Sequence, residues 1–215
     1  MNTYVFRIEC LSNLHAGSGD SGGFGVVDKL VQRDPANNDP VIHASGLKGA
    51  LREHFSGQSW VERVFGSDSS QRGDAQIKPG EYKFFQADLL ALPQPQDAPP
   101  YFRQISSVDY LEQLRQHYVA LGAGQLTLAI LRSTYQDNPN EFRELADNLP
   151  VIARNQLDNG ISKNLWYEEV VPRQSVFLTC IKAPDRDLID ALNGQVVQVG
   201  GNATVGYGFC KFTLI

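Results

Sequence analysis

The chain has 215 residues, of which 42% are hydrophobic, and this is enough for a single well-buried core. Nineteen Lys and Arg against 24 Asp and Glu give a formal net charge of -5, which argues against nucleic acid as a partner unless the cations gather on one face. Cys10, Cys180 and Cys210 lack the spacing of a zinc site or a redox pair. We expect one domain over residues 1–215, with buried thiols in a reducing cytoplasm and no membrane contact, since no apolar run approaches about 20 residues.

The first quarter of the chain predicts strands, a glycine-rich loop and a helix. Residues 3–11 alternate apolar and polar side chains with the period of two that is typical of a half-buried strand. Five glycines within residues 17–25 predict a loop, and residues 26–34 predict a second strand. Ser45 is expected to cap a helix over residues 46–55.

The middle of the chain mixes helices, strands and irregular segments. A short helix is expected over residues 59–66 and a mobile loop over residues 67–81. Residues 82–92 predict a strand that the proline-rich segment 93–100 stops. Residues 107–119 have helical apolar spacing, with an acidic residue in the first turn.

The second half predicts a strand over residues 125–131, a short helix over residues 140–149 and a turn at residues 158–160. Two strands, 164–171 and 175–183, are separated by a proline. The last residues predict a helix (185–192), a strand (194–200), a glycine loop (201–208) and a final strand (209–215). This order predicts an α+β fold with helices on an antiparallel sheet of ferredoxin-like type, and insertions are expected within residues 66–80, 93–106 and 132–172.

The first candidate site is His15 with the glycine-rich segment that follows it. Backbone N–H groups of Gly17, Ser18 and Gly19 could hold an RNA sugar-phosphate; the alternative is a plain flexible turn. The pattern GxxxxGK[ST] is absent, which disfavours a nucleoside triphosphatase. The one match to GxSxG, GDSGG at residues 19–23, falls inside the glycine-rich segment and is not followed by an expected helix, so it is not a nucleophile elbow; HExxH does not occur, and hydrolase and zinc-protease functions find no support.

Asp28 is the second candidate. A carboxylate close to glycine-rich backbone could hold a divalent ion or position a ribose 2'-hydroxyl for attack on the adjacent phosphodiester. The alternative is a solvated surface aspartate, which is the commoner role of a lone Asp.

Lys48 and Arg52 are spaced one turn apart on the helix that follows Ser45. Two cations on one face near a helix N-terminus suit a phosphate contact. The alternative is a solvated basic face.

Two further segments carry candidate binding residues. Glycines in the segment GGNATVGYG allow close approach of backbone to a ligand, and Tyr207 could stack on a base or sugar; the alternative is a glycine-rich hairpin. Glu168 and Glu169 are adjacent on an expected strand, so they point to opposite faces and cannot easily share one ligand. Tyr167 beside them could stack on a base, although packing is the simpler role of this segment.

The order of these pieces resembles the RAMP superfamily of CRISPR proteins. The series is LHAGSGDSGG, VVDKLVQRD, VIHASGLKGALREHF, VFG, FQADLLALP and GGNATVGYGFCKF. The middle segment LPVIARNQLDNGISKNLWYEEVVPRQSVF resembles the repeated backbone subunit of type III-B (Cmr) effector complexes. The chain looks shorter than is usual for this subunit, and Ser45-Gly46 stands where the family has two serines.

The resemblance implies a ferredoxin-like RNA-recognition core with a C-terminal glycine-rich loop, and copies that stack along one guide RNA beside other effector subunits. It also implies a hairpin that wedges between guide and target, and metal-dependent cleavage of target RNA, with Mg²⁺ as the expected ion. Asp28 falls on the family's catalytic and metal-binding aspartate and His15 near a position that supports cleavage, with Tyr167 and Glu168 as support. The residues expected to bind RNA are Gly17, Ser18, Gly19, Ser45, Lys48, Arg52, Gly200, Gly201, Gly206, Tyr207 and Gly208.

Three hypotheses of function follow. The first is a guide-binding backbone subunit that cleaves complementary target RNA through Asp28. The second is an architectural RNA-binding subunit without catalysis. The third is a metal-independent enzyme that processes CRISPR RNA with His15 as general acid or base.

Overall fold

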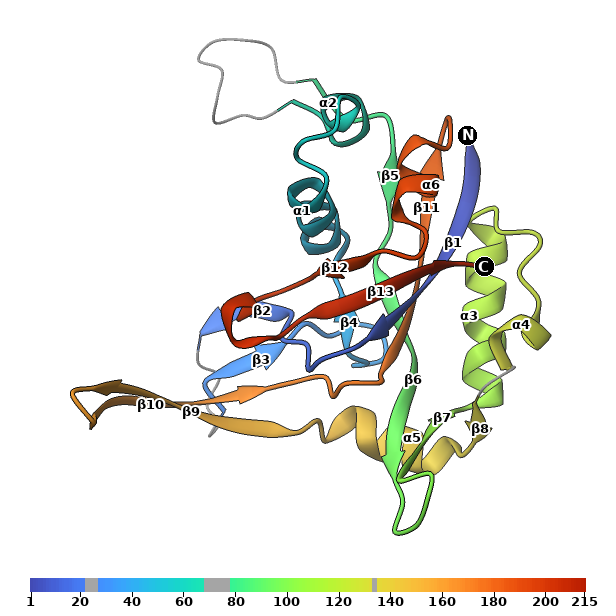
Figure 1. The fold of residues 1–215 in the computed structure, drawn as a ribbon. Coiled ribbons are helices and arrows are strands. Elements are labelled where there is room, and N and C mark those ends of the chain that lie inside the picture. The colour runs from blue at the N-terminus through green and yellow to red at the C-terminus, as the bar shows by residue number, and fades with distance from the viewer. Residues whose placement is uncertain (22–26, 68–77, 133–134) are drawn as a thin grey trace.

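The computed structural model describes residues 1–21, 27–67, 78–132 and 135–215 (Figure 1). Two sheets and several helices make a mixed α+β fold, as the sequence predicts. Most of the predicted mobile loop at 67–81 lies outside the described residues. None of the helices in the described parts of the chain has the length and apolar character that a membrane span needs.

The larger sheet has nine strands, in the order β12-β13-β1-β11-β6-β7-β8, with β4 paired to β6 and β5 paired to β11. Its strands are β1 (Asn2–Cys10), β4 (Val41–Ile42), β5 (Lys83–Phe84), β6 (Ala87–Pro95), β7 (Phe102–Ser106), β8 (Gln136–Asp137), β11 (Val176–Ala183), β12 (Val196–Gln198) and β13 (Phe209–Leu214). The first strand lies between β13 and β11 and is antiparallel to both. The first and the last strand of the chain are therefore neighbours in this sheet.

Helices cover both faces of this sheet because β1 alternates its buried side chains. Phe6 and Ile8 belong to a core cluster with buried leucines of α1 and α6, whereas Val5 belongs to a second cluster with α3. The helices are α1 (Ala44–His54), α2 (Val61–Phe65), α3 (Val108–Ala120), α4 (Leu128–Arg132), α5 (Pro139–Asp147) and α6 (Asp187–Leu192), with a 3₁₀ turn η1 at Ala203–Val205.

The smaller sheet has the order β2-β3-β10-β9 and ends in a hairpin that projects from the body (Figure 1). Its strands are β2 (Gly17–Ser21), β3 (Lys29–Val31), β9 (Val151–Asp158) and β10 (Ile161–Glu169). Asn159 and Gly160 form the two-residue turn with φ of 50° and 81°, the double positive φ that favours Asn-Gly in tight hairpins. The predicted turn at 158–160 is thus confirmed, whereas the sequence did not predict β9.

Most other predicted elements are confirmed, with small shifts at their ends. Residues 3–11 form β1, and residues 107–119 form α3, whose first turn is capped by the Ser107 hydroxyl accepting from the Tyr110 N–H. Gly66 ends α2 with a φ of 96°. The short helix α5 and the final series α6, β12, glycine loop and β13 also lie where they were expected.

Three predictions near the N-terminus need correction. Part of the predicted glycine loop is the strand β2, and the strand expected over 26–34 is only Lys29–Val31, because the pairing of β2 with β3 is irregular between Gly17 and Ser21. Ser45 is not the helix cap. The helix begins at Ala44, and the capping position is His43, whose N–H donates to Gln32 Oε1 at 2.7 Å.

The strand predicted over 82–92 is split into β5 and β6, and β6 continues through two prolines. Leu92 to Pro95 pair with Ile105 to Phe102 of β7. The Gln96 N–H donates to the Tyr101 carbonyl, so the even-numbered residues bond to β7 and the prolines point their missing N–H groups the other way. Proline-rich sequence therefore does not end this strand.

The strand predicted over 125–131 was also wrong, because α4 occupies Leu128–Arg132. Thr127 precedes this helix, and its hydroxyl accepts from the Ile130 N–H at 3.3 Å, which is a capping interaction. Leu126 and Leu131 are buried in the core cluster beneath α3. The cap residue was a better guide here than the run of apolar residues.

Candidate functional site

Four segments that lie far apart in sequence meet at the root of the projecting hairpin. Leu14 and Val171 exchange two backbone hydrogen bonds of 2.9 Å, which fix the segment before His15 against the end of β10. The Gly201 N–H donates to the His15 carbonyl, which adds the C-terminal loop, and the Asp28 N–H donates to the Tyr167 carbonyl, which adds the start of β3.

His15 is buried, and its tautomer is set by the backbone. Its Nδ1 lies 2.8 Å from the Glu169 carbonyl oxygen, which can only accept, so Nδ1 carries the proton. Nε2 is then the basic nitrogen of the neutral ring. A Cβ at Gly17 would lie 3.1 Å from Nε2, so glycine leaves this nitrogen room.

A cavity of about 370 Å³ adjoins His15. It is lined by His15, Gly17, Ser18, Gly19, Lys29, Leu30 and Gly201. The structure therefore brings together four of the predicted RNA-binding residues, Gly17, Ser18, Gly19 and Gly201, with the predicted His15. Lys29 had no predicted role.

Glu168 holds the segments together. Its side chain is 1% exposed and accepts hydrogen bonds from Trp166 Nε1 at 2.7 Å, Asn202 Nδ2 at 2.9 Å and Lys29 Nζ at 3.0 Å, while Arg154 lies 4.0 Å away. Burial alone would raise the pKa of this carboxyl. The Trp166 and Lys29 donors outweigh burial and hold the pKa of Glu168 below its usual range, so the group stays ionised.

Glu169 faces the other way, as predicted for adjacent strand residues. It accepts from Arg33 Nη2 and from the Val31 N–H. The two glutamates thus have separate partners and do not form one ligand pair.

Asp28 is exposed, and its carboxylate is fixed at one end. Oδ2 accepts from the Tyr167 N–H at 2.7 Å, so the side chain lies against the backbone of β10 at Tyr167, which is itself exposed. Within the described ranges, no group of three or more His, Cys, Asp or Glu side chains could hold a metal ion. Asp28 could supply one carboxylate to a divalent ion, and the other ligands would have to come from outside the described side chains.

The C-terminal loop uses its glycines for packing more than for ligand approach. A Cβ at Gly200 would lie 2.5 Å from the His15 carbonyl oxygen, and one at Gly208 would lie 1.9 Å from the Val199 carbonyl oxygen, and both residues have positive φ. Gly206 has open space around it. Tyr207 lies under the guanidinium of Arg154, 5.4 Å from the ring centroid, so one face of the predicted stacking residue already has a partner.

The structure does not join Ser45, Lys48 or Arg52 to this cavity. Ser45 is exposed and Lys48 is half-buried on α1, while Arg52 Nη1 donates to the Gly66 carbonyl at 2.8 Å and so closes the end of α2. Among the described residues, no hydrogen bond or ion pair connects these three side chains to His15 or Asp28. Lys29, Arg154 and Asn202 are the polar contacts of Glu168 that sequence reasoning missed. Lys29 is 139 residues and Asn202 is 34 residues away from Glu168 in the sequence, so no local spacing indicates these pairs.

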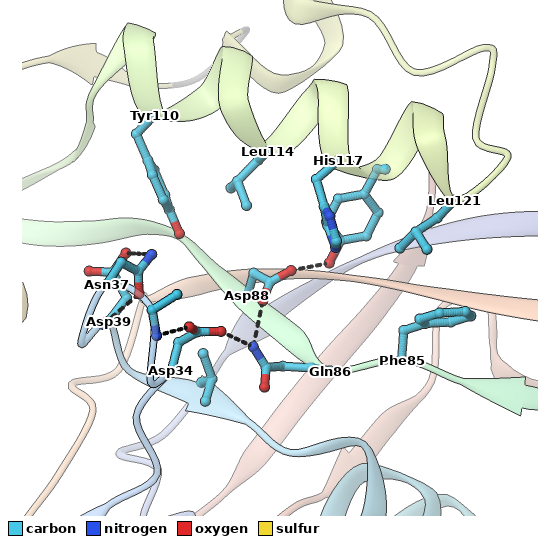
Figure 2. A pocket seen from close by; sticks show the side chains of 13 residues that line it. Asp34, Asn37, Asp39, Phe85, Gln86, Asp88, Tyr110, Leu114, His117 and Leu121 are labelled. Atoms are coloured by element: carbon cyan, nitrogen blue, oxygen red, sulfur yellow. Dashed lines mark hydrogen bonds between the residues drawn. The ribbon is translucent and has the colours of Figure 1, made fainter.

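A second cavity of about 410 Å³ lies between α3 and β6 (Figure 2). Gln86 donates to both Asp34 Oδ2 and Asp88 Oδ1 at its floor. Tyr118 contacts Asp88 Oδ2 at 2.8 Å and the Leu178 carbonyl at 2.5 Å, although its hydroxyl has one proton for two acceptors. Burial raises the pKa of Asp88, and a proton on Asp88 would satisfy both contacts. This cluster has no link to the His15 cavity in the described structure.

The comparisons with known proteins agree with this fold. A family model described as the RAMP superfamily matches residues 7–211, and the chain belongs to this superfamily. The CRISPR system Cmr endoribonuclease Cmr4 of Pyrococcus furiosus is 25% identical over 286 aligned positions that cover 100% of this chain and 96% of that protein. Because the alignment is longer than this chain, the relative carries insertions that this chain lacks.

Two solved structures share the fold over the full chain. One, the type III-B Cmr-beta complex bound to cognate target RNA, contains a chain with a TM-score of 0.76 and 18% identity, covering 100% of this chain and 97% of that chain. The other is oligomeric Cmr4 from Pyrococcus furiosus, with a TM-score of 0.72, 19% identity and coverage of 100% and 98%.

Gly208→Ala is expected to destabilise the fold far more than Gly206→Ala, although both residues have similar positive φ. A left-handed conformation costs an alanine about 1–2 kcal/mol, which is the whole expected loss at Gly206. At Gly208 the new Cβ would also collide with backbone, and we expect a loss of more than about 3 kcal/mol. Urea unfolding of the two variants measures the difference, and equal losses would contradict the packing role of Gly208.

The stability of the protein should depend on pH through Asp88. Its folded-state pKa is raised, so ionisation disfavours the fold: the stabilisation is fully present below the unfolded pKa of about 4 and is lost as pH rises through the folded pKa. Asp88→Asn should remove this loss, so the free energy of unfolding of the variant should rise relative to that of the wild type as the pH rises from about 4 to 7. Unfolding free energies across this range measure it. Asp97→Asn, on an exposed loop, serves as the control and should follow the wild type.

Proposed function

We propose that this chain is a guide-RNA-binding backbone subunit of a type III-B CRISPR effector complex and that it cleaves complementary target RNA within that complex. One observation carries the proposal: the exposed carboxylate of Asp28 is fixed by the Tyr167 N–H at the root of a projecting hairpin, and the next residue, Lys29, lines the cavity beside His15. The 25% identical relative is named a Cmr endoribonuclease.

The partners that fit are guide RNA, target RNA, further copies of this chain and other effector subunits. One structural neighbour is a Cmr complex bound to target RNA and another is an oligomer. A ferredoxin-like core fits the same role. The chain order β1, α1, β6, β11, α6, β13 and the sheet order β13-β1-β11-β6 support this topology, since they follow the β-α-β-β-α-β pattern.

The hairpin β9–β10 is the element we assign to wedging between guide and target. Its strands of eight and nine residues reach roughly 25 Å at 3.4 Å per residue. Apolar side chains are exposed near its tip, with Leu157 61% and Ile161 65% exposed. Such side chains gain from contact with the faces of unstacked bases.

The chemistry we propose is attack of a ribose 2'-oxygen on the neighbouring phosphorus. Asp28 orients the 2'-hydroxyl or accepts its proton, the P–O5' bond breaks, and the 5'-oxygen takes up a proton. The products are a 2',3'-cyclic phosphate and a 5'-hydroxyl end. A divalent ion, Mg²⁺ by resemblance, would be held by Asp28 together with RNA phosphate and would offset the charge that develops there. His15, which lines the cavity and has Nε2 as its unprotonated nitrogen when the ring is neutral, would contact the same sugar-phosphate.

Asp28→Ala is expected to lower target cleavage by at least about 100-fold while guide RNA remains bound, because only the proton acceptor and ion ligand are removed. The measurement is single-turnover cleavage of labelled target by the reconstituted complex, with guide content determined separately. Asp97→Ala, on an exposed loop outside the hairpin and the cavity, is the matched control and should cleave normally. Loss of cleavage and guide together would mean that Asp28 is structural.

The alternatives separate in the same assay. Unchanged cleavage by the Asp28→Ala complex would support an architectural subunit without catalysis. Cutting of repeat RNA by the isolated chain in the presence of a chelator, lost in His15→Ala, would support a processing enzyme. Chelator-sensitive cleavage of target by the complex is the outcome expected from our proposal.

A further inference from the structure

We propose that the ammonium group of Lys29 binds the scissile phosphate of the target strand and stabilises the charge that develops on it. This inference rests on the proposed function and adds a catalytic residue to it. It follows from the positions of three cations near the hairpin root, Lys29, Arg33 and Arg154, and from which of these side chains has donors left for a ligand.

Lys29 is the residue after Asp28 and lines the cavity that His15 adjoins. Its side chain is 51% exposed, although Nζ is held at 3.0 Å from Glu168 Oε1 and 5.1 Å from the centroid of the Trp166 ring. An ammonium has three N–H donors, and Glu168 accepts one. The group is therefore fixed in place while donors remain for a ligand.

The other cations near the hairpin root are less available. Arg33 is 18% exposed and donates to Glu169 and to the carbonyls of Asn38 and Ala146. Arg154 is 22% exposed and lies over the Tyr207 ring. Of the cations that the structure describes around this cavity, Lys29 is the one with a half-exposed side chain on the cavity wall.

The cavity suits a phosphodiester. Its wall combines the Lys29 ammonium with the basic Nε2 side of His15 and with glycine backbone, which allows close approach of a sugar-phosphate. A phosphodiester carries one negative charge, and attack by the 2'-oxygen develops a second on the phosphoryl oxygens. A cation fixed beside them stabilises the transition state more than the bound substrate.

The test is a double-mutant cycle in which one change is made in the protein and the other in the target RNA. The quantity measured is the affinity of the reconstituted complex for the target. The target carries a 2'-deoxy nucleotide at the scissile position, so that it is not cut, and either a normal phosphate or a neutral methylphosphonate at the following linkage. We expect the methylphosphonate to weaken binding by about tenfold in the wild type. Lys29→Met should show the same loss with the normal phosphate and no further loss with the neutral one.

Lys211→Met is the matched control, because Lys211 is an exposed cation on β13 that does not line the cavity, and this variant should keep the full methylphosphonate effect. If Lys29→Met does not assemble, Lys29→Gln enters the same cycle. Independent, additive losses for Lys29 and the phosphate would overturn the inference. With a cleavable target, loss of the ammonium should lower the single-turnover rate by about 100-fold or more, partly restored by Lys29→Arg.

The two proposals fail in different ways. If the wild-type complex binds target without cleaving it, the proposed activity is rejected. The cycle would still report whether Lys29 contacts the phosphate. If the wild-type complex cleaves the target but the losses in the cycle are additive, the proposed role of Lys29 is rejected and the proposed function stands.

Discussion

The buried carboxylate of Glu168 is the interaction on which the site depends. A buried charge is costly unless donors surround it, and the donors here come from β3, from β10 itself and from the C-terminal loop. The described pairing of β3 with β10 is a single parallel bridge between Lys29 and Glu168, so ladder hydrogen bonds alone would align these strands weakly. The side-chain contacts of Glu168 supply the alignment. On the other face of the sheet, Glu169 likewise joins β10 to the chain around β3 by accepting from Arg33.

The same arrangement explains how an acidic chain can offer a phosphate site. The formal charge of -5 counts Glu168 and Glu169, but both are buried and paired, whereas Lys29 is half-exposed. Phosphate responds to the local potential at a surface and not to the sum over the molecule. Burying acids beneath an exposed cation therefore fixes the cation in position and reduces the negative charge that an approaching strand meets.

Periodicity predicted the elements whose burial follows a simple pattern, such as β1 and α3. It failed where a local signal competed: Thr127 caps α4 inside a run of apolar residues, and the prolines of β6 fall at positions that need no N–H donor. For the site, the sequence singled out His15 and Asp28 as separate features, and the fold brings them to one hairpin root. Lys29 and Asn202 were missed because their roles depend on Glu168, and no local spacing indicates a partner so distant in sequence.

In the proposed function, the position of the cavity at the base of the hairpin would link wedging and cleavage, two tasks that would otherwise need separate elements. A hairpin inserted between guide and target displaces a base pair, and an unpaired nucleotide can rotate its 2'-hydroxyl into line with the phosphorus more freely than a stacked one. Asp28 is hydrogen-bonded to Tyr167 of β10, and Lys29 to Glu168 of the same strand. Because both groups are hydrogen-bonded to the hairpin that would displace the nucleotide, a shift of the hairpin would carry the carboxylate and the ammonium with it and keep them together.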